Sequence, residues 1–292
     1  MHEIAFVTYR GLPQLWPGDQ LAAAELARHG VRVVPAAWDD ESVDWAGFDA
    51  VVVRSTWDYW TRVDEFASWI DARSVDGTAL WNPARLLRWN LDKTYLRDLE
   101  ARGVPTVPTS WPEPGDTLAG VMADRGWTRA VVKPRVSGNG AGTWIVDVPP
   151  TARDEEALAR TIESAGAMVQ PFVAEVADPG EWSLIFLGGS FSHAVIKRPG
   201  TGEFRVQQEH GGSAQLATAP RRLVEAAERV LAEVDEPWLY ARVDGCDVDG
   251  RFLLMELEML EPSLFLDLHP AAPFRFAASI RALLAGRTAA AR

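Results

Sequence analysis

Short apolar runs alternate with amphipathic segments over the first third of the chain. Runs rich in β-branched residues predict strands, and three are expected over residues 4–9, 31–34 and 50–53. Asp19 is expected to cap the N-terminus of a helix over residues 20–28. A strand, a helix and a strand at this spacing indicate a parallel α/β sheet.

Polar side chains come directly after the third of these strands. They are Arg54, Ser55, Thr56 and Asp58. Ligands of open parallel sheets bind beyond the carboxyl ends of the strands, so these four residues are candidates for substrate contact. A loop in which Ser55 or Thr56 caps the next helix, expected over residues 62–73, is an equally good interpretation.

Lys93 lies where another helix is expected to begin. The helix is predicted over residues 91–101, with Asn90 as its N-cap and Gly103 after its end. The helix dipole disfavours a cation in the first turn, so Lys93 at this place suggests an anion nearby.

A strand that carries Lys133 near its end is followed by a glycine-rich loop. The candidates for phosphate contact in this loop are Ser137, Gly138, Asn139 and Gly140. Small residues let backbone N–H groups approach phosphate oxygens. Such a loop is more often a plain turn, but a lysine just upstream strengthens the nucleotide interpretation. No Gly-Lys-Ser/Thr follows the glycines, which excludes a Walker loop.

The strongest chemical signal is a predicted hairpin whose strands flank Asp249-Gly250. A three-residue loop over 248–250 with a bulged turn is expected, and it would place Cys246 opposite Phe252. In that register one face is charged and the other is apolar. The charged face would hold Arg242, Asp244, Glu256 and Glu258. The apolar face would hold Leu239, Ala241, Val243, Met255, Leu257 and Met259. A two-residue loop would slip the register and scatter the carboxylates over both faces.

The charged face of this hairpin predicts a metal site. Three carboxylates this close need a counter-ion, and hard oxygen ligands suit Mg²⁺, which also holds substrate phosphates. The expected ligands are Asp244, Glu256 and Glu258. A solvated sheet face is the usual interpretation of charge on strands, but Arg-x-Asp facing Glu-x-Glu is unusual.

Composition narrows the classes of function. The chain has 292 residues, 47% of them hydrophobic, and a net charge of −12, which argues against nucleic acid as the main partner. An anionic nucleotide would then need local cations, and Lys197, Arg198 and Arg205 could supply them. The only cysteine, Cys246, excludes an internal disulfide and is expected in the core. No apolar stretch is long enough to span a membrane and the start reads as a strand, so a cytoplasmic protein is expected.

The order of these motifs resembles the ATP-grasp superfamily. The resemblance rests on Arg242-Val243-Asp244, on Glu256-Leu257-Glu258, and on a lysine before a glycine-rich loop. Lys197-Arg198, then Phe204-Arg205 and Gly211-Gly212, are most similar to the glutathione-synthetase and ribosomal-protein glutamate-ligase branch. Glu258 and Gln207 stand where most members have Asn.

The resemblance implies an α/β fold of the ATP-grasp type. A parallel α/β domain would come first, followed by two α+β subdomains that clamp the nucleotide. The expected boundaries are 1–88 for the substrate domain, 89–168 for the subdomain with the lid loop, 169–286 for the subdomain with the metal hairpin, and 287–292 for a tail. The last helix is expected over residues 273–284, with fraying from Gly286.

The resemblance also implies roles for single residues. The nucleotide would be bound by Lys93, Lys133, the loop residues Ser137 to Gly140, Gln170, Phe172, Val173 and, on the ribose, Glu181. The catalytic cations would be Arg242, Arg205, Lys197 and Arg198. Gly211, Gly212 and Ser263 would join Arg54, Ser55, Thr56 and Asp58 in contacting substrate. The implied cofactors are ATP and Mg²⁺, with Mn²⁺ as an alternative ion.

The implied activity is that of an ATP-dependent carboxylate–amine ligase on a small amino-acid-like substrate. It would convert ATP to ADP and phosphate through an acyl phosphate. Size and nucleotide motifs also resemble ligases that close the ring of cycloserine, so intramolecular ring closure is an alternative. A non-catalytic nucleotide-binding regulator is the alternative from another class. The expected partners are a small-molecule carboxylate and amine, without nucleic acid or membrane, and a homodimer is left open.

Overall fold

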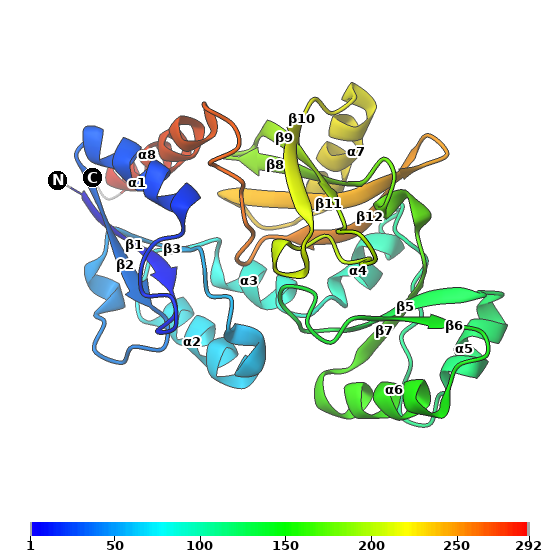
Figure 1. Cartoon of the computed structure of the whole chain (residues 1–292). Helices are drawn as coiled ribbons and strands as arrows, with labels where there is room; N and C mark the ends of the chain where they lie inside the picture. The colour runs from blue at the N-terminus through cyan, green and yellow to red at the C-terminus, as the bar shows by residue number, and fades with distance from the viewer. Residues whose placement is uncertain (1, 291–292) are drawn as a thin grey trace.

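Three sheets organise the protein in the computed structural model, which describes residues 2–290 (Figure 1). The first is a parallel sheet with strand order β2-β1-β3-β4. Its strands are β1 (His2–Thr8), β2 (Val31–Ala37), β3 (Ala50–Val53) and β4 (Leu80–Trp81). Helices α1 (Pro17–Arg28) and α2 (Val63–Val75) flank it. The predicted parallel α/β unit is therefore confirmed.

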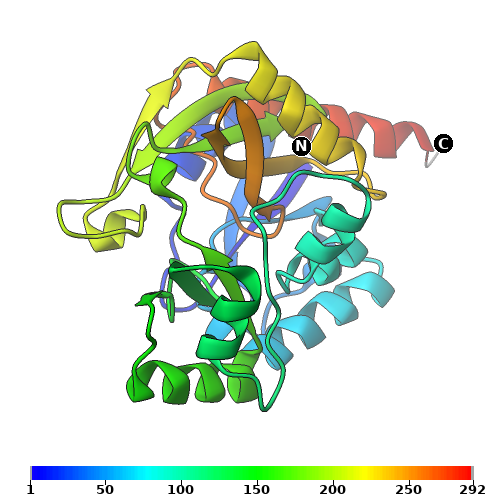
Figure 2. The same cartoon turned by 90° about the vertical axis from the view of Figure 1, so that its right-hand side faces the viewer.

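The second sheet is small and antiparallel, with order β6-β5-β7. Its elements are β5 (Arg129–Pro134), β6 (Trp144–Asp147), β7 (Ala167–Pro171), α5 (Leu118–Arg125) and α6 (Ala152–Ala165). Its core joins Leu118 and Met122 of α5 to Leu158 of α6 and to the strands. The unit lies beside the third sheet, and Figure 2 shows it after a turn of 90° that brings the right-hand side of Figure 1 to the front.

The third sheet is antiparallel, with order β10-β9-β8-β11-β12. Its strands are β8 (Glu181–Leu187), β9 (Ser190–Arg198), β10 (Ser213–Ala217), β11 (Tyr240–Val248) and β12 (Arg251–Glu258). Helices α3 (Ala84–Asn90), α4 (Tyr95–Ala101) and α7 (Arg221–Ala232) share its core. One apolar cluster thus joins α3 and α4, which precede the second sheet in the sequence, to strands that follow that sheet.

The β11–β12 hairpin differs from its predicted register. Asp249 (φ 49°) and Gly250 (φ 79°) both adopt positive φ and form a two-residue turn, so Cys246 pairs with Leu253 and not with Phe252. Two successive positive φ angles suit the tight hairpin turn that Asp-Gly favours, which is why the predicted three-residue loop was wrong.

A β-bulge next to Asp244 restores the charged face. The register shifts between Asp244 and Gly245, so that Asp244 pairs with Glu256 and Arg242 pairs with Glu258. The extra residue of the bulge is Met255 in β12. It lines the cavity described below, although it was predicted on the apolar face. The carboxylates therefore share a face as expected, but a bulge in the strand produces that face, and not the turn.

Two predicted helix caps are wrong. Helix α1 begins at Pro17 after Trp16, so Asp19 lies inside its first turn, where it is buried and accepts a hydrogen bond from Arg54 Nε (2.9 Å). Asn90 ends α3, and its side chain donates to Leu257 O (2.8 Å) and accepts from Met259 N (2.7 Å). Lys93 therefore lies between two helices, and the helix-dipole argument does not apply to it.

The last helix, α8 (Ala272–Ala290), is longer than predicted and is helical where fraying was expected. Residues 291 and 292 of the predicted tail lie outside the described part of the chain. Helix α8 packs beside α1 (Figure 1), and Phe276 and Ile280 share a core cluster with Phe6 and Leu26. We therefore propose that α8 belongs with the first domain and not with the hairpin subdomain.

The linker after α4 runs along the outer edge of β12. Val107 N donates to Leu254 O (3.0 Å), and Leu254 N donates to Pro105 O (2.9 Å). Further along, Ser110 N donates to Val169 O of β7 (2.8 Å), so the linker connects the edges of two sheets. Among residues 2–290, no helix is both long and apolar enough to cross a membrane.

Candidate active site

A cavity of about 300 Å³ is lined by residues of all three units. Most residues that the sequence marked as candidates lie on its wall. They are Lys93, Lys133, Ser137, Gly138, Asn139, Gly140, Gln170, Phe172, Val173, Glu181, Lys197, Arg205, Arg242, Glu256, Glu258 and Ser263. The structure therefore brings together residues separated by up to 170 positions along the chain (263 − 93).

The candidates after β3 are not on the cavity wall. Arg54 is buried and paired with Asp19, Ser55 and Thr56 are fully buried, and Asp58 accepts hydrogen bonds from Trp38 Nε1 (2.9 Å) and Arg62 Nη2 (2.5 Å). Their aromatic neighbours Trp57 and Tyr59 line the cavity instead. These four candidates are thus buried or bonded to other residues of the protein, because the end of β3 packs under the chain that follows β12.

Four other candidates also lie off the wall. Arg198, Gly211 and Gly212 are outside the residues that line the cavity, although Lys197 and Arg205, next to them in the motif, are part of it. Asp244 is buried beneath the wall, under Arg242.

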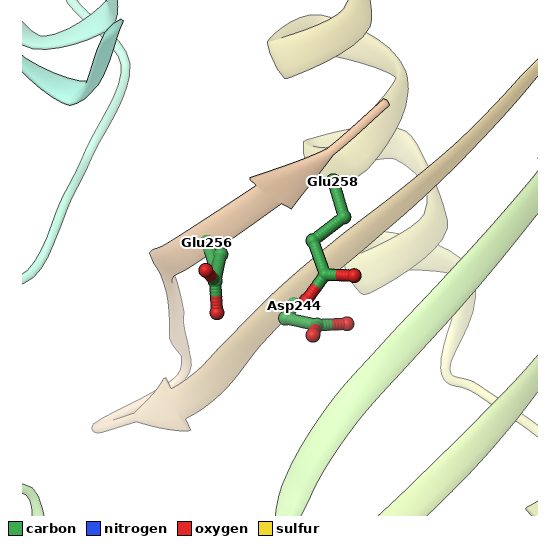
Figure 3. A group of neighbouring side chains, drawn as sticks. All are labelled: Asp244, Glu256 and Glu258. Carbon is green, nitrogen blue, oxygen red and sulfur yellow. The ribbon is translucent and has the colours of Figure 1, made fainter. Parts of the chain in front are cut away.

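Asp244, Glu256 and Glu258 form one cluster (Figure 3), and each offers a carboxylate oxygen within 4.8 Å of the others. Adjacent strands present all three side chains to one side of the hairpin. An all-carboxylate donor set of this spacing fits Mg²⁺ or Mn²⁺ and is unsuited to soft metals, which prefer sulfur.

Cations surround the carboxylate cluster. Lys197 Nζ lies 3.0 Å from Asp244 Oδ2 and 2.7 Å from Glu181 Oε1, and Lys93 Nζ lies 3.1 Å from Glu256 Oε1. Arg242 donates from Nε and Nη2 to Asp244, and from Nη2 to Glu258. Ser183 Oγ donates to Asp244 Oδ1 at 2.7 Å. The hydrogen bonds and cations hold the carboxylates in place without a metal.

The three carboxylates differ in the direction in which their pKa values are shifted. Burial alone would raise the pKa of Asp244, but Arg242 and Lys197 lower it to about 2. Burial would likewise raise the pKa of Glu256, but Lys93 and Lys133 lower it. Burial raises the pKa of Glu258 to about 8. The charge of Arg242 opposes this rise, and the charges of Glu256 and Asp244 add to the rise. A carboxyl with this pKa is largely protonated at neutral pH, and a metal cation would favour its charged form.

Lys133 has no charge partner at contact distance. Among residues 2–290, no ion pair or side-chain hydrogen bond reaches its Nζ, and burial lowers its pKa despite the charge of Glu256. A half-buried amine without a partner can bind a ligand anion and loses no internal ion pair by doing so. This supports contact between Lys133 and a phosphate more directly than its sequence position did.

The glycine-rich loop contacts three neighbours. Lys93 Nζ donates to Ser137 O (3.3 Å), His210 Nε2 bonds to Asn139 O (3.2 Å), and Gly138 lies so close to the Trp60 indole that a Cβ would come within 2.7 Å. The loop thus reaches all three units of the protein in this conformation.

We expect Gly140→Val to lower turnover by at least about 10²-fold, because a Cβ there would lie 3.1 Å from Gln207 Oε1 and would hold backbone N–H groups away from phosphate. The positive φ of 68° adds strain of about 1–3 kcal/mol. Gly189→Val (φ 85°), in the β8–β9 turn, is the matched control for that strain. Equal loss of turnover in both variants would contradict a role of the loop in catalysis. Hydrogen exchange across 137–142 should slow when Mg²⁺ and a non-hydrolysable ATP analogue are added.

The segment predicted to face adenine lines the cavity, but one side chain points elsewhere. Gln170 is buried and donates from Nε2 to Thr109 Oγ1 (3.0 Å). Phe172 is stacked by Arg129, whose Cζ lies 4.7 Å from the ring centroid. Gln170 therefore offers its backbone, and Phe172 and Val173 offer apolar surface, to a ligand in the cavity.

Several wall residues were missed in the sequence. They are Trp16, Asn90, Tyr95, Met255 and Glu261. A signal existed for Glu261, a third acidic residue that closely follows Glu256 and Glu258 and directly precedes Pro262. The aromatic residues carried no such signal, because aromatic side chains usually pack in cores.

The comparisons with known proteins agree with this geometry. The family model described as the N-terminal domain of D-cycloserine synthetase DcsG matches residues 4–82. The cycloserine biosynthesis protein DcsG of Streptomyces lavendulae is 35% identical over 273 residues, which are 86% of this chain and 88% of that protein. A glutathione synthetase of Ralstonia nicotianae is 24% identical, over 79% of this chain and 69% of that protein.

Solved structures extend the similarity to the whole chain. The crystal structure of D-cycloserine synthetase DcsG matches with a TM-score of 0.86 and 30% identity, over 97% of this chain and 99% of that one. D-alanine–D-alanine ligase from Bacillus anthracis has a TM-score of 0.69 at 14% identity, over 96% and 95%. An ATP-grasp RimK-domain protein from Sphaerobacter thermophilus has a TM-score of 0.68 at 17% identity, over 94% and 98%. The last two show a shared fold only.

Proposed function

The chain belongs to the ATP-grasp ligases and is an ATP-dependent enzyme that forms carbon–nitrogen bonds, and on this premise we propose the chemistry of its site. The proposed reaction activates the carboxylate of a small amino-acid-like substrate as an acyl phosphate, with release of ADP. An amine then displaces the phosphate. The alternative of a non-catalytic regulator is set aside, because the chain belongs to a family of enzymes.

One observation carries the proposal: a carboxylate cluster and a partnerless lysine line the same cavity under a glycine-rich loop. Within residues 2–290 no ion pair holds Lys133, and burial together with the charges of Glu256 and Asp244 raises the pKa of Glu258, so that its charged form needs a cation. A nucleotide that brings phosphates together with Mg²⁺ would satisfy both groups at once. Neither a phosphate without a cation nor a cation alone would do so.

Each group then has a role. Asp244, Glu256 and Glu258 would hold Mg²⁺, or Mn²⁺ in its place, and the ion would supply charge neutralisation at the phosphates. Lys133 and Lys93 would bind phosphate oxygens. The Arg242 guanidinium, held by Asp244 and lining the cavity, would stabilise the charge that develops on the substrate's carboxyl oxygen during attack by the amine. Catalysis would thus rest on position and charge, without a protein nucleophile.

We expect the phosphate released to carry one oxygen from the substrate carboxylate. Activation as an acyl phosphate joins that oxygen to phosphorus, and displacement by the amine leaves it there. The measurement is a reaction with ¹⁸O-labelled carboxylate, after a screen of carboxylates and amines by ADP release. Phosphate without the label would rule out the acyl phosphate.

Ring closure within one molecule is the second candidate, favoured by 35% identity to a cycloserine biosynthesis protein. The amine would then belong to the molecule that carries the carboxylate. A product mass equal to the substrate minus water, and a rate independent of added amine, would identify ring closure. A product mass equal to the carboxylate plus the amine minus water would identify intermolecular ligation.

A further inference from the structure

Six consecutive backbone carbonyls after β12 each accept a hydrogen bond from a different side chain. The donors are Asn82 to Met259 O (2.7 Å), Tyr240 to Leu260 O (2.9 Å), Trp57 to Glu261 O (3.1 Å), Arg54 to Pro262 O (3.1 Å), Arg242 to Ser263 O (3.0 Å) and His193 to Leu264 O (3.1 Å). We refer to residues 259–264 as the pinned segment. Its donors come from both the first domain and the third sheet, so its backbone is fixed relative to both.

Glu261 is the only acidic residue of the pinned segment, and it lines the cavity. Asp244, Glu256 and Glu258 each pair with Lys197, Lys93 or Arg242, but no ion pair within residues 2–290 includes Glu261. Burial raises the pKa of Glu261, against the opposing charges of Lys93 and Arg242. It also lies outside the group of oxygens that could share one metal. The segment therefore holds, apart from the metal ligands, a carboxylate at the cavity that has no direct ion pair within residues 2–290.

Aromatic side chains line the same cavity. Trp57 donates to the Glu261 backbone, and Trp16 meets Trp57 edge to face with ring centroids 4.9 Å apart. Tyr59 also lines the cavity and lies close enough to Glu261 to feel its charge. A carboxylate and aromatic rings that line one cavity can bind an organic cation, through charge and through the ring faces.

We propose that Glu261 binds the ammonium group of an amino-acid-like substrate and so determines which substrates the cavity accepts. The proposal rests on the ligase function and adds to it. A carboxylate beside an ammonium group favours the protonated form. The bound amino group therefore has no lone pair with which to attack the acyl phosphate, and the attacking amine must be a different nitrogen, in the acceptor or elsewhere in the same molecule. Glu261 thus acts both in specificity and in protecting the substrate from self-condensation.

Binding of small probes tests this without any turnover. The probes are D-cycloserine and D- and L-alanine, each compared with the molecule that lacks the amino group, isoxazolidin-3-one and propanoate. Calorimetry with Mg²⁺ and ADP present should show that at least one amino compound binds wild type about 10- to 100-fold more tightly than its partner. In Glu261→Gln this preference should disappear, while the affinity for the probe without the amino group stays unchanged.

Three further variants separate charge from position. Glu261→Asp keeps the carboxylate and should retain part of the preference. Trp57→Phe keeps the ring but removes the donor to Glu261 O, and should weaken ammonium binding without changing ADP affinity. Asp247→Asn removes a carboxylate from the same hairpin, where it pairs with Arg222 on the surface, and should change nothing.

Three results would overturn the proposal: no binding of any amino probe by wild type, equal binding of both members of each pair, or an unchanged preference in Glu261→Gln. Absence of ADP release with every substrate, together with a Glu261-dependent preference, would instead overturn the ligase chemistry and leave the ammonium site standing.

Discussion

Glu256→Gln is expected to lower Mg²⁺-dependent turnover by at least about 10³-fold, a loss of about 4 kcal/mol of transition-state stabilisation. The variant keeps the size of the side chain but removes one of three metal charges. Folding should be retained at a small cost in stability, because the variant loses the charge pair with Lys93 but also relieves repulsion from Asp244. The measurements are ADP release at saturating Mg²⁺, Mg²⁺ affinity by calorimetry, and the melting temperature.

The matched control is Asp247→Asn, because Asp247 belongs to the same hairpin but pairs with Arg222 outside the cluster. This variant should retain wild-type turnover and Mg²⁺ affinity. Wild-type turnover in Glu256→Gln at ample Mg²⁺ would remove Glu256 from the metal site. Loss of turnover in both variants would point to the fold of the hairpin, and not to the metal.

Arg242→Met should lower the free energy of unfolding by about 3–5 kcal/mol in the absence of metal. The Arg242 guanidinium is buried and bonds to Asp244, Glu258 and Ser263 O. Methionine fills similar space but leaves Glu258 without a cation and Asp244 with Lys197 alone. Urea unfolding followed by circular dichroism gives the value.

Mg²⁺ should stabilise Arg242→Met more than wild type, because the ion replaces part of the missing positive charge. Turnover should stay low even with Mg²⁺, since the guanidinium on the substrate side is gone. Arg222→Met is the control, and loss of that exposed pair with Asp247 should cost no more than about 1 kcal/mol. Similar stability losses in the two variants would show that Arg242 is not a structural centre of the cluster.

The alternation of apolar and polar residues was enough to predict the first sheet and the charged face of the hairpin. Apolar runs such as 50–53 are fully buried, and the strands form where those runs lie. Arg242 and Asp244 share a face of β11, and Glu256 and Glu258 share a face of β12, because residues two apart on a strand point the same way. These features depend on local sequence and can therefore be predicted from it.

The features that the sequence did not predict depend on contacts between distant segments. The bulge at Met255 has no local signal, and it corrected a register that the Asp249-Gly250 turn alone would have set otherwise. Arg54 follows a strand as a binding residue would, but Asp19 and Pro262 O engage it inside the protein. Glu261 was overlooked because only the structure shows which carboxylates near it have ion-pair partners, and that within residues 2–290 Glu261 has none.

Helix α8 makes the first domain depend on a segment that is synthesised long after the rest of that domain. The rings of Phe6 and Phe276 lie 6.1 Å apart, although 270 positions separate them in the sequence (276 − 6). During translation the apolar face of β1 and α1 emerges first and stays uncovered until residues 272–290 leave the ribosome. A nascent chain, or one cut short before α8, therefore exposes a surface that chaperones bind and that promotes aggregation.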